Sequence, residues 1–182
     1  MLSVIYITSC TRPIPDDPWA CNYVYCKNDG RCDSARCKCP VGYEGTDCGI
    51  AVTDKYIAHW RMHTVVWASD SANYVGAEKF YNIELATSAS NTTFFLNNLD
   101  NNSYYNHIIC RIDSLDNTHF KFDSTSSLNM YYDRYRIRGG WGNIYSRYSA
   151  NDSLMGTLYI QRLNSTVNWQ HDTVMFYAMK IK

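Results

Sequence analysis

The sequence predicts an all-β protein in two parts: a small disulfide-rich module, then an antiparallel β-barrel, with a β-sandwich as the alternative for the second part. Six cysteines crowd the stretch from Cys21 to Cys48. Beyond residue 50, short runs of alternating apolar and polar residues are separated by clusters rich in Asn, Asp and Gly. No long segment has the 3.6-residue period of an amphipathic helix.

The composition narrows the class of protein. The chain has 182 residues, with 17 Lys+Arg against 17 Asp+Glu, so its net charge is zero. A nucleic-acid-binding protein normally has a basic excess, and we therefore expect no nucleic-acid partner. The 16 Tyr and 5 Trp favour β-structure. No apolar run is long enough to form a membrane-spanning helix.

The first ten residues resemble the end of a bacterial lipoprotein signal. The lipobox of that family is an aliphatic residue, two small residues and a cysteine, which Ile7-Thr8-Ser9-Cys10 fits. The resemblance implies that Cys10 carries a lipid and that residues 1–9 are a partial signal segment, since no Lys or Arg precedes the apolar run. Residues 10–20 hold three of the four prolines, which predicts an extended tether. The alternative is a disulfide between Cys10 and Cys110.

The cysteine spacing of residues 21–49 resembles that of an EGF-like domain, most clearly in the tail Cys37-Lys-Cys39-Pro-Val-Gly42-Tyr43-Glu-Gly45-Thr-Asp-Cys48. A segment this short cannot bury a core and needs disulfides, which indicates export. Spacing alone allows many connectivities. The resemblance implies a spacer or binding unit and the pairs Cys21–Cys32, Cys26–Cys37 and Cys39–Cys48.

The module lacks the patterns of a metal site. Zinc favours paired Cys-x2-Cys knuckles and often His, and neither occurs between Cys21 and Cys48. EGF-like domains that bind calcium carry an acidic or amide residue beside the first cysteine, where this chain has Pro18-Trp19-Ala20. We therefore expect no metal and no other cofactor.

Residues 50–182 contain eight or nine predicted strands, separated by turn clusters at 97–103, 116–117, 139–140 and 151–152. The period of two places one set of residues on the apolar faces of these strands. These residues are Tyr56, Ala58, Trp60, Met62, Thr64, Val66, Tyr81, Ile83, Leu85, Phe94, Leu96, Ile108, Cys110, Ile112, Phe120, Phe122, Leu154, Leu158, Ile160, Val174, Phe176 and Ala178.

The strand number, the size and a first strand that reaches Trp60 resemble small lipocalin-like barrels. The position of the lipocalin Gly-x-Trp motif is occupied by Ala58-His59-Trp60. The order of parts also resembles predicted Bacteroidota lipoproteins, in which a β-domain follows one EGF-like unit. The resemblance implies a barrel over residues 50–182.

One segment combines arginines with aromatic residues and is the candidate binding patch: Arg134, Arg136, Arg138, Trp141 and Tyr145. On a strand the three arginines share one face. One interpretation is a hairpin with its arginines in solvent and its aromatics in the core. The other is a site for a sugar acid, a lipid headgroup or single-stranded nucleic acid, because aromatic rings stack and Arg pairs with anions; nucleic acid is the least favoured of the three for an exported, neutral chain.

Other reactive side chains give weaker signals. His59 and His63 lie four residues apart, which on a strand is about 13 Å and too far for one metal ion. Cys110 falls between Ile108 and Ile112, which predicts a buried, unreactive thiol. No nucleophile elbow, P-loop or dinucleotide fingerprint occurs, so we expect no enzyme and assign no catalytic residue.

Together these features predict a non-catalytic lipoprotein of the bacterial outer membrane that binds or adheres to a polysaccharide or a partner protein. The alternatives are a lipocalin-like carrier of a small lipophilic molecule and a secreted structural or glycoprotein module without a small ligand. A cavity lined by Tyr and Trp favours the carrier, whereas a solid core with exposed aromatic residues favours adhesion.

Overall fold

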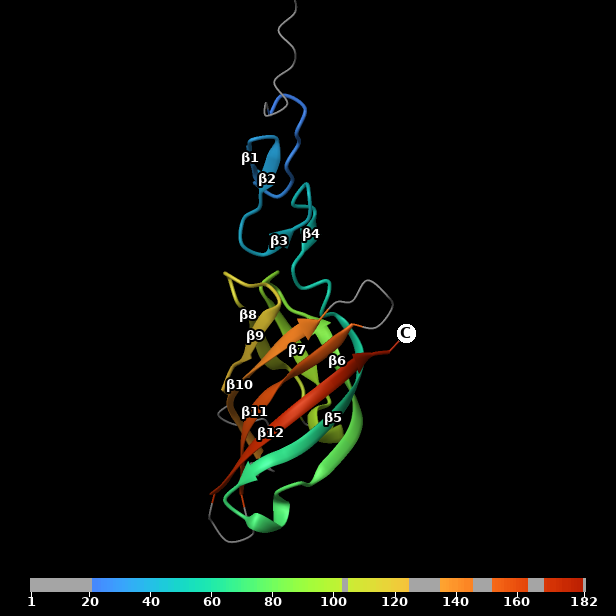
Figure 1. The fold of residues 1–182 in the computed structure, drawn as a ribbon, viewed down its shortest axis with the longest axis vertical. Coiled ribbons are helices and arrows are strands. Elements are labelled where there is room, and N and C mark those ends of the chain that lie inside the picture. The colour runs from blue at the N-terminus through green and yellow to red at the C-terminus, as the bar shows by residue number, and fades with distance from the viewer. Residues whose placement is uncertain (1–20, 103–104, 125–134, 146–151, 164–168, 182) are drawn as a thin grey trace, which may run out of the picture.

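The computed structural model describes residues 21–102, 105–124, 135–145, 152–163 and 169–181, which form a disulfide-rich module and a closed antiparallel barrel (Figure 1). Both parts are β-structure, as the sequence predicts. Figure 1 shows the module beyond one end of the barrel, here called the near end; the opposite end is the far end. Within the described ranges, no helix is long and apolar enough to cross a membrane. Cys10 and Arg134 lie outside those ranges.

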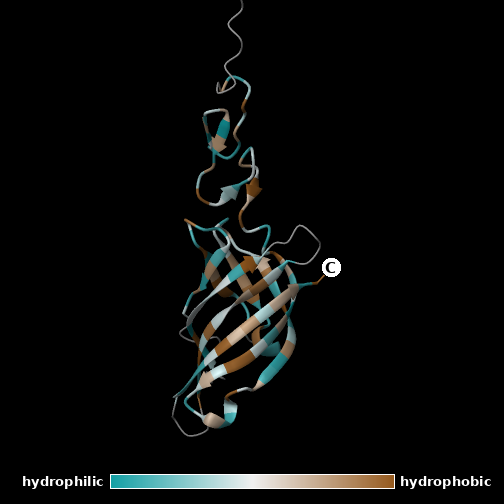
Figure 2. Cartoon of the chain, in the orientation of Figure 1, coloured by the Kyte–Doolittle hydropathy of each residue, from teal (hydrophilic) through white to brown (hydrophobic). Residues whose placement is uncertain are grey.

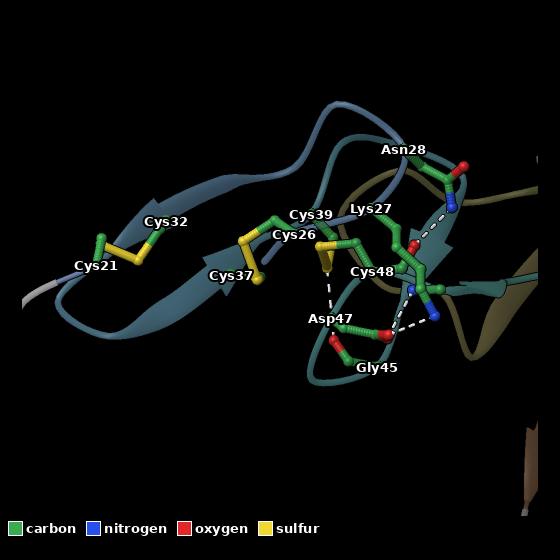
Figure 3. The surroundings of a disulfide bond; sticks show 11 residues. Cys21, Cys26, Lys27, Asn28, Cys32, Cys37, Cys39, Gly45, Asp47 and Cys48 are labelled. Atoms are coloured by element: carbon green, nitrogen blue, oxygen red, sulfur yellow. Dashed lines mark hydrogen bonds and ion pairs between the residues drawn. A yellow bond between two sulfur atoms is a disulfide. The ribbon is translucent and has the colours of Figure 1, made fainter. Parts of the chain in front are cut away.

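Three disulfides hold the module together (Figure 3). They join Cys21 to Cys32, Cys26 to Cys37 and Cys39 to Cys48, which are the pairs that the EGF-like resemblance implies. Two small hairpins complete the module: β1 (Arg31–Asp33) with β2 (Arg36–Lys38), and β3 (Tyr43–Glu44) with β4 (Ile50–Ala51). Because β4 pairs with β3, the strand pairing of the module continues past residue 49.

An ion pair ties the two halves of the module to each other. Lys27 Nζ lies 2.8 Å from Asp47 Oδ2, and the Lys27 amide donates to the Asp47 carbonyl at 2.8 Å. The side-chain amide of Asn28 donates to the Cys48 carbonyl at 2.8 Å (Figure 3). These contacts supplement the disulfides, which stabilise a unit with so little buried surface.

The barrel is an up-and-down meander in which each strand pairs with the next and the last pairs with the first. Its strands are β5 (Ala58–Ser69), β6 (Glu78–Thr87), β7 (Thr93–Asn97), β8 (Ile108–Ile112), β9 (His119–Phe122), β10 (Tyr135–Tyr145), β11 (Ser153–Leu163) and β12 (Trp169–Lys180). The 3-10 turn η1 (Ala72–Tyr74) lies in the β5–β6 connection, and η2 (Leu99–Asn101) follows β7. Each of the eight described barrel strands therefore pairs with a neighbour on both sides.

The period-two prediction of the apolar faces is confirmed. On β5, Trp60, Met62, Thr64 and Val66 are buried, and the predicted apolar residues of the other barrel strands are buried as well. Figure 2 shows apolar and polar residues alternating along the strands, as expected where one face packs inside a barrel.

The segment between the module and β5 closes the near end of the barrel. Tyr56 has no exposed surface; its ring stacks on Phe94 at 4.8 Å and meets Phe120 edge-on at 5.5 Å. The Tyr56 hydroxyl donates to the carbonyl of Asn117, and Trp60 Nε1 donates to the carbonyl of Tyr56. This aromatic cluster fills the lumen and leaves its polar atoms paired.

β10 runs through Gly139 and Gly140, with a β-bulge between Ile137 and Gly139, so the prediction of a turn at this pair is wrong. Their φ angles are +137° and +145°, which favour glycine. A Cβ on Gly140 would lie 2.3 Å from the Thr157 carbonyl oxygen on the neighbouring strand. Glycine here therefore permits close strand packing and a bulge, whereas a sequence pattern cannot distinguish this use of Gly-Gly from a turn.

Candidate ligand-binding site

A pocket of about 220 Å³ opens at the far end of the barrel. It is built from the far halves of β5, β6, β11 and β12, from the start of β10, and from η1 and η2. Its lining residues are Thr64, Val66, Tyr74, Ala77, Lys79, Tyr81, Leu99, Asp100, Tyr135, Leu158, Ile160, Arg162 and Val174. The aromatic cluster that fills the near end does not extend into this pocket, whose lining combines aliphatic residues with three tyrosines and charged residues.

One charged pair sits at the inner rim of this pocket. Asp172 on β12 is 2 % exposed, and its carboxylate accepts a hydrogen bond from the Arg162 guanidinium on β11. Gln170 Nε2 donates to Asp172 Oδ1 at 3.3 Å and to Ser69 Oγ at 2.7 Å. The ring of Tyr74 lies 4.6 Å from the Arg162 guanidinium carbon. A buried charge is tolerated only when it is paired and hydrogen-bonded, as this pair is.

The Asp172 carboxylate stabilises the charged form of the Arg162 guanidinium. Burial acts to lower the pKa of Arg162, but the hydrogen bond and charge of Asp172 outweigh it, and the pKa lies above its ordinary value. A second pair closes the rim, with Lys79 Nζ 2.6 Å from Asp100 Oδ1. Both cations of the pocket therefore already have a carboxylate partner.

Two phenols supply the uncharged polar groups of the pocket. Burial raises the pKa of Tyr81 and of Tyr135 above the ordinary value of a phenol. Both hydroxyls therefore stay protonated at neutral pH and can donate as well as accept a hydrogen bond. Tyr135 is held by stacking on Tyr105, with ring centroids 4.6 Å apart.

The candidate patch around β10 lies on the outside of the barrel. The bulge at Gly139 shifts the alternation by one residue, so Arg138, Trp141 and Tyr145 all face outward. Trp141 and Tyr145 are each 46 % exposed, so the interpretation of a hairpin with its aromatics in the core does not hold for them. Arg136 faces the Trp169 ring, 4.2 Å from its centroid.

The patch does not surround a common hollow. Arg138 borders one of about 340 Å³ with Tyr159 and His171, whereas Trp141 borders another with Leu115 and Lys121. Arg134 belongs to the predicted patch but lies outside the described residues.

The histidine and cysteine candidates show no reactive arrangement. His63 Nε2 lies 3.1 Å from Glu78, and its ring stacks on Phe80 at 4.1 Å. No group of three His, Cys, Asp or Glu that could hold a metal is found in the described part of the chain. Cys110 is a free thiol with no exposed surface, so the alternative disulfide with Cys10 is not formed, and burial raises the thiol pKa.

Sequence analysis missed the polar residues of the far pocket, although a signal for them exists. Arg162 continues the inward series of Leu158 and Ile160, and Asp172 precedes the inward Val174. Charged residues at inward positions of two neighbouring strands indicate a buried pair. The signal lies at strand ends, where the limits of a strand are hardest to place from sequence.

Comparisons with protein-family models, with curated proteins and with solved structures give no match to this chain. The resemblances to EGF-like domains, to lipocalins and to lipoproteins therefore rest on the cysteine pattern, the barrel and the lipobox residues themselves.

Proposed function

We propose that this protein is a non-catalytic binding protein of the bacterial envelope whose barrel takes up a small, uncharged, amphiphilic molecule at its far end. The observation that supports it is the pocket of about 220 Å³, with an aliphatic wall and three tyrosines, at the far end of a barrel that is filled with side chains at the near end. Concave apolar sites with a few convergent polar groups are the usual form of a small-molecule site.

The charge arrangement favours an uncharged ligand. An anion would have to compete with Asp172 for Arg162, or with Asp100 for Lys79, because each cation is already paired. Breaking the buried Arg162–Asp172 pair leaves one charge uncompensated, which costs several kcal/mol, whereas the more exposed Lys79–Asp100 pair opposes an anion only weakly. The hydroxyls of Tyr81 and Tyr135 can instead pair with a ligand hydroxyl, amide or ring N–H.

The volume limits the size of the ligand. A cavity of about 150 Å³ holds benzene, whereas pockets for drug-sized molecules start near 300 Å³. The far pocket lies between these values. A molecule of one or two rings, or an equivalent short aliphatic chain, therefore fits.

Calorimetric titration with indole, benzyl alcohol, benzoate and benzylamine tests this function. We expect the two uncharged probes to bind with a Kd on the order of 100 µM and the two ions to bind far more weakly. Val174→Phe places a larger side chain in the pocket and should abolish binding, while Thr173→Phe, on the outward neighbour, should not. Equal affinity for charged and uncharged probes, or binding that survives Val174→Phe, contradicts the proposal.

The envelope location rests on the lipobox resemblance of Ile7-Thr8-Ser9-Cys10. In this proposal Cys10 carries the lipid anchor, residues 11–20 form the tether, and the module spaces the barrel from the outer membrane. The mass of the Cys10 peptide from the membrane fraction tests it. A diacylglyceryl adduct on a new N-terminus supports anchoring; a soluble product with unmodified Cys10 favours a secreted protein.

Adhesion to an anionic polysaccharide is the second candidate function, favoured by the hollow of about 340 Å³ where exposed Arg138 lies beside Tyr159 and His171. Arg pairs with carboxylates while an aromatic ring stacks on a sugar. Polyglucuronate should bind and an uncharged glucan should not, and Arg138→Gln should remove the difference. Equal binding of both polymers contradicts this function.

A further inference from the structure

One outer face of the barrel carries large apolar side chains in place of the usual polar ones. We call it the β10–β12 face and define it by its exposed large residues, each 40–46 % exposed: Trp141, Tyr145, Met155, Met175, Tyr177 and Met179. Outward positions on the opposite side of the barrel carry charged residues instead, among them Glu84 and Arg111. Exposed large apolar residues elsewhere, such as Trp67, Phe80 and Leu115, lie on separate elements, whereas those of this face lie on three adjacent strands.

Large and small residues alternate across this face. The strand register sets Trp141 beside Thr157, and Met155 beside Asn143. Ser153 lies between Tyr145 on one strand and Met179 on the other. The face is therefore a lattice in which most of the large, protruding side chains have a small residue as a neighbour. The large side chains of a second copy can pack over these small residues.

The chemistry of the face is that of a protein interface. No charged residue occupies the outward positions of this face, which run from Trp141 to Tyr145 on β10, from Ser153 to Tyr159 on β11 and from Thr173 to Met179 on β12. Aromatic residues and Met are enriched at the centres of protein interfaces, whereas charged residues are depleted there. Three methionines also disfavour a sugar ligand, which needs hydrogen-bonding groups. Polar residues such as His119, Lys121 and Arg61 border the face, as in the rim of an interface.

We propose that the β10–β12 face binds a second copy of this chain, forming a dimer with two-fold symmetry about the middle of β11. A two-fold interface requires a surface that is complementary to itself, which the alternating lattice provides. The six large residues and their small neighbours offer roughly 600 Å² per partner, near the lower limit of specific interfaces. The dimer is therefore weak in solution, and anchoring both copies to one membrane raises its population through effective concentration. It leaves the far pocket open, since the two sites use different surfaces.

Sedimentation equilibrium of the soluble chain, from residue 11 onward, tests the dimer. We expect reversible association with a Kd on the order of 10–100 µM. Met155→Lys puts a charge at the centre of the face and should weaken association at least about 30-fold. Val75→Lys is the matched control, since Val75 is 51 % exposed and lies at the end of η1, away from this face; its association should equal that of the wild type.

Cross-linking gives a second, independent measurement. Thr157→Cys places a thiol beside the proposed two-fold axis and should form a disulfide with its own copy, whereas Asn82→Cys, on the outside of β6, should not. The buried thiol of Cys110 does not compete. A monomer at millimolar concentration, association unchanged by Met155→Lys, or binding of the monomer to phosphatidylethanolamine–phosphatidylglycerol vesicles through this face overturns the proposal.

Discussion

The two ends of the barrel share one strand pattern but differ in what the inward positions hold. At the near end, the packed rings of Tyr56, Phe94 and Phe120 fill the lumen, and the Tyr56 hydroxyl donates to the carbonyl of Asn117. At the far end, the inward positions hold Arg162 and Asp172, whose pairing occupies the rim but leaves space beneath it. The alternation of apolar and polar residues therefore predicts a closed barrel but not whether its lumen is filled. The size and polarity of the inward side chains at each end determine that.

The largest expected effect comes from opening the near end. Tyr56→Ala removes a ring with no exposed surface and should lower the free energy of unfolding by about 4 kcal/mol. Tyr74→Ala at the far rim is the control; since Tyr74 is 44 % exposed, it should cost less than about 1 kcal/mol. Urea denaturation measures both. Equal losses would show that the two ends are equally packed.

Breaking the Arg162–Asp172 ion pair at the far end should have the next largest effect on stability. Asp172→Ala leaves the Arg162 charge without its carboxylate and should lower the free energy of unfolding by about 3 kcal/mol, because a lone charge remains half-buried. Asp123→Ala breaks a more exposed pair with Arg111 and should have a much smaller effect. If Asp172→Ala is as stable as the wild type, the Arg162 side chain must be able to rotate into solvent, and the ion pair does not hold the rim of the pocket in place.

Thiol reactivity compares the two ends directly. Since burial raises the pKa of Cys110, iodoacetamide should not alkylate it in the native protein between pH 7 and pH 9. In Tyr74→Cys, the new rim thiol should react at a rate that rises over this range as the thiolate forms. Mass spectrometry after timed quenching measures both. Rapid native alkylation of Cys110 would indicate an open near end.

The smallest expected effect concerns the joint between the module and the near end. Glu44 accepts hydrogen bonds from Lys55 and Asn117, so Glu44→Ala should destabilise the barrel by about 1 kcal/mol and leave indole binding unchanged. Asp33→Ala, at an exposed ion pair with Lys38 within the module, should produce no measurable change. Loss of indole binding in Glu44→Ala would show that the two ends are coupled.

Much of the fold follows from the sequence because period-two burial is a local signal. The inward residues of β5 and β8, from Trp60 to Val66 and from Ile108 to Ile112, follow from alternation alone. The cysteine pattern likewise gives the module, since so short a segment has no other means of stability. The bulge before Gly139 does not follow, because it depends on the register between β10 and β11, which no local pattern gives.

The candidate sites follow less well. Neighbouring residues on one strand can be grouped from sequence, and the outward arginines of β10 were found in this way. The far pocket joins residues from η1, η2 and five strands, and no local pattern brings Tyr74, Asp100 and Arg162 together. The β10–β12 face was missed because it depends on the register of three strands.

The central claim is that the ligand binds at the open far end of the barrel and not at the filled near end. The most direct test is to titrate ¹⁵N-labelled protein with indole and to map the changes in amide chemical shift. The account predicts saturable changes at Thr64, Tyr81 and Val174, with none at Trp60 or Phe94. No changes at millimolar indole, or changes centred on the near end, would contradict it.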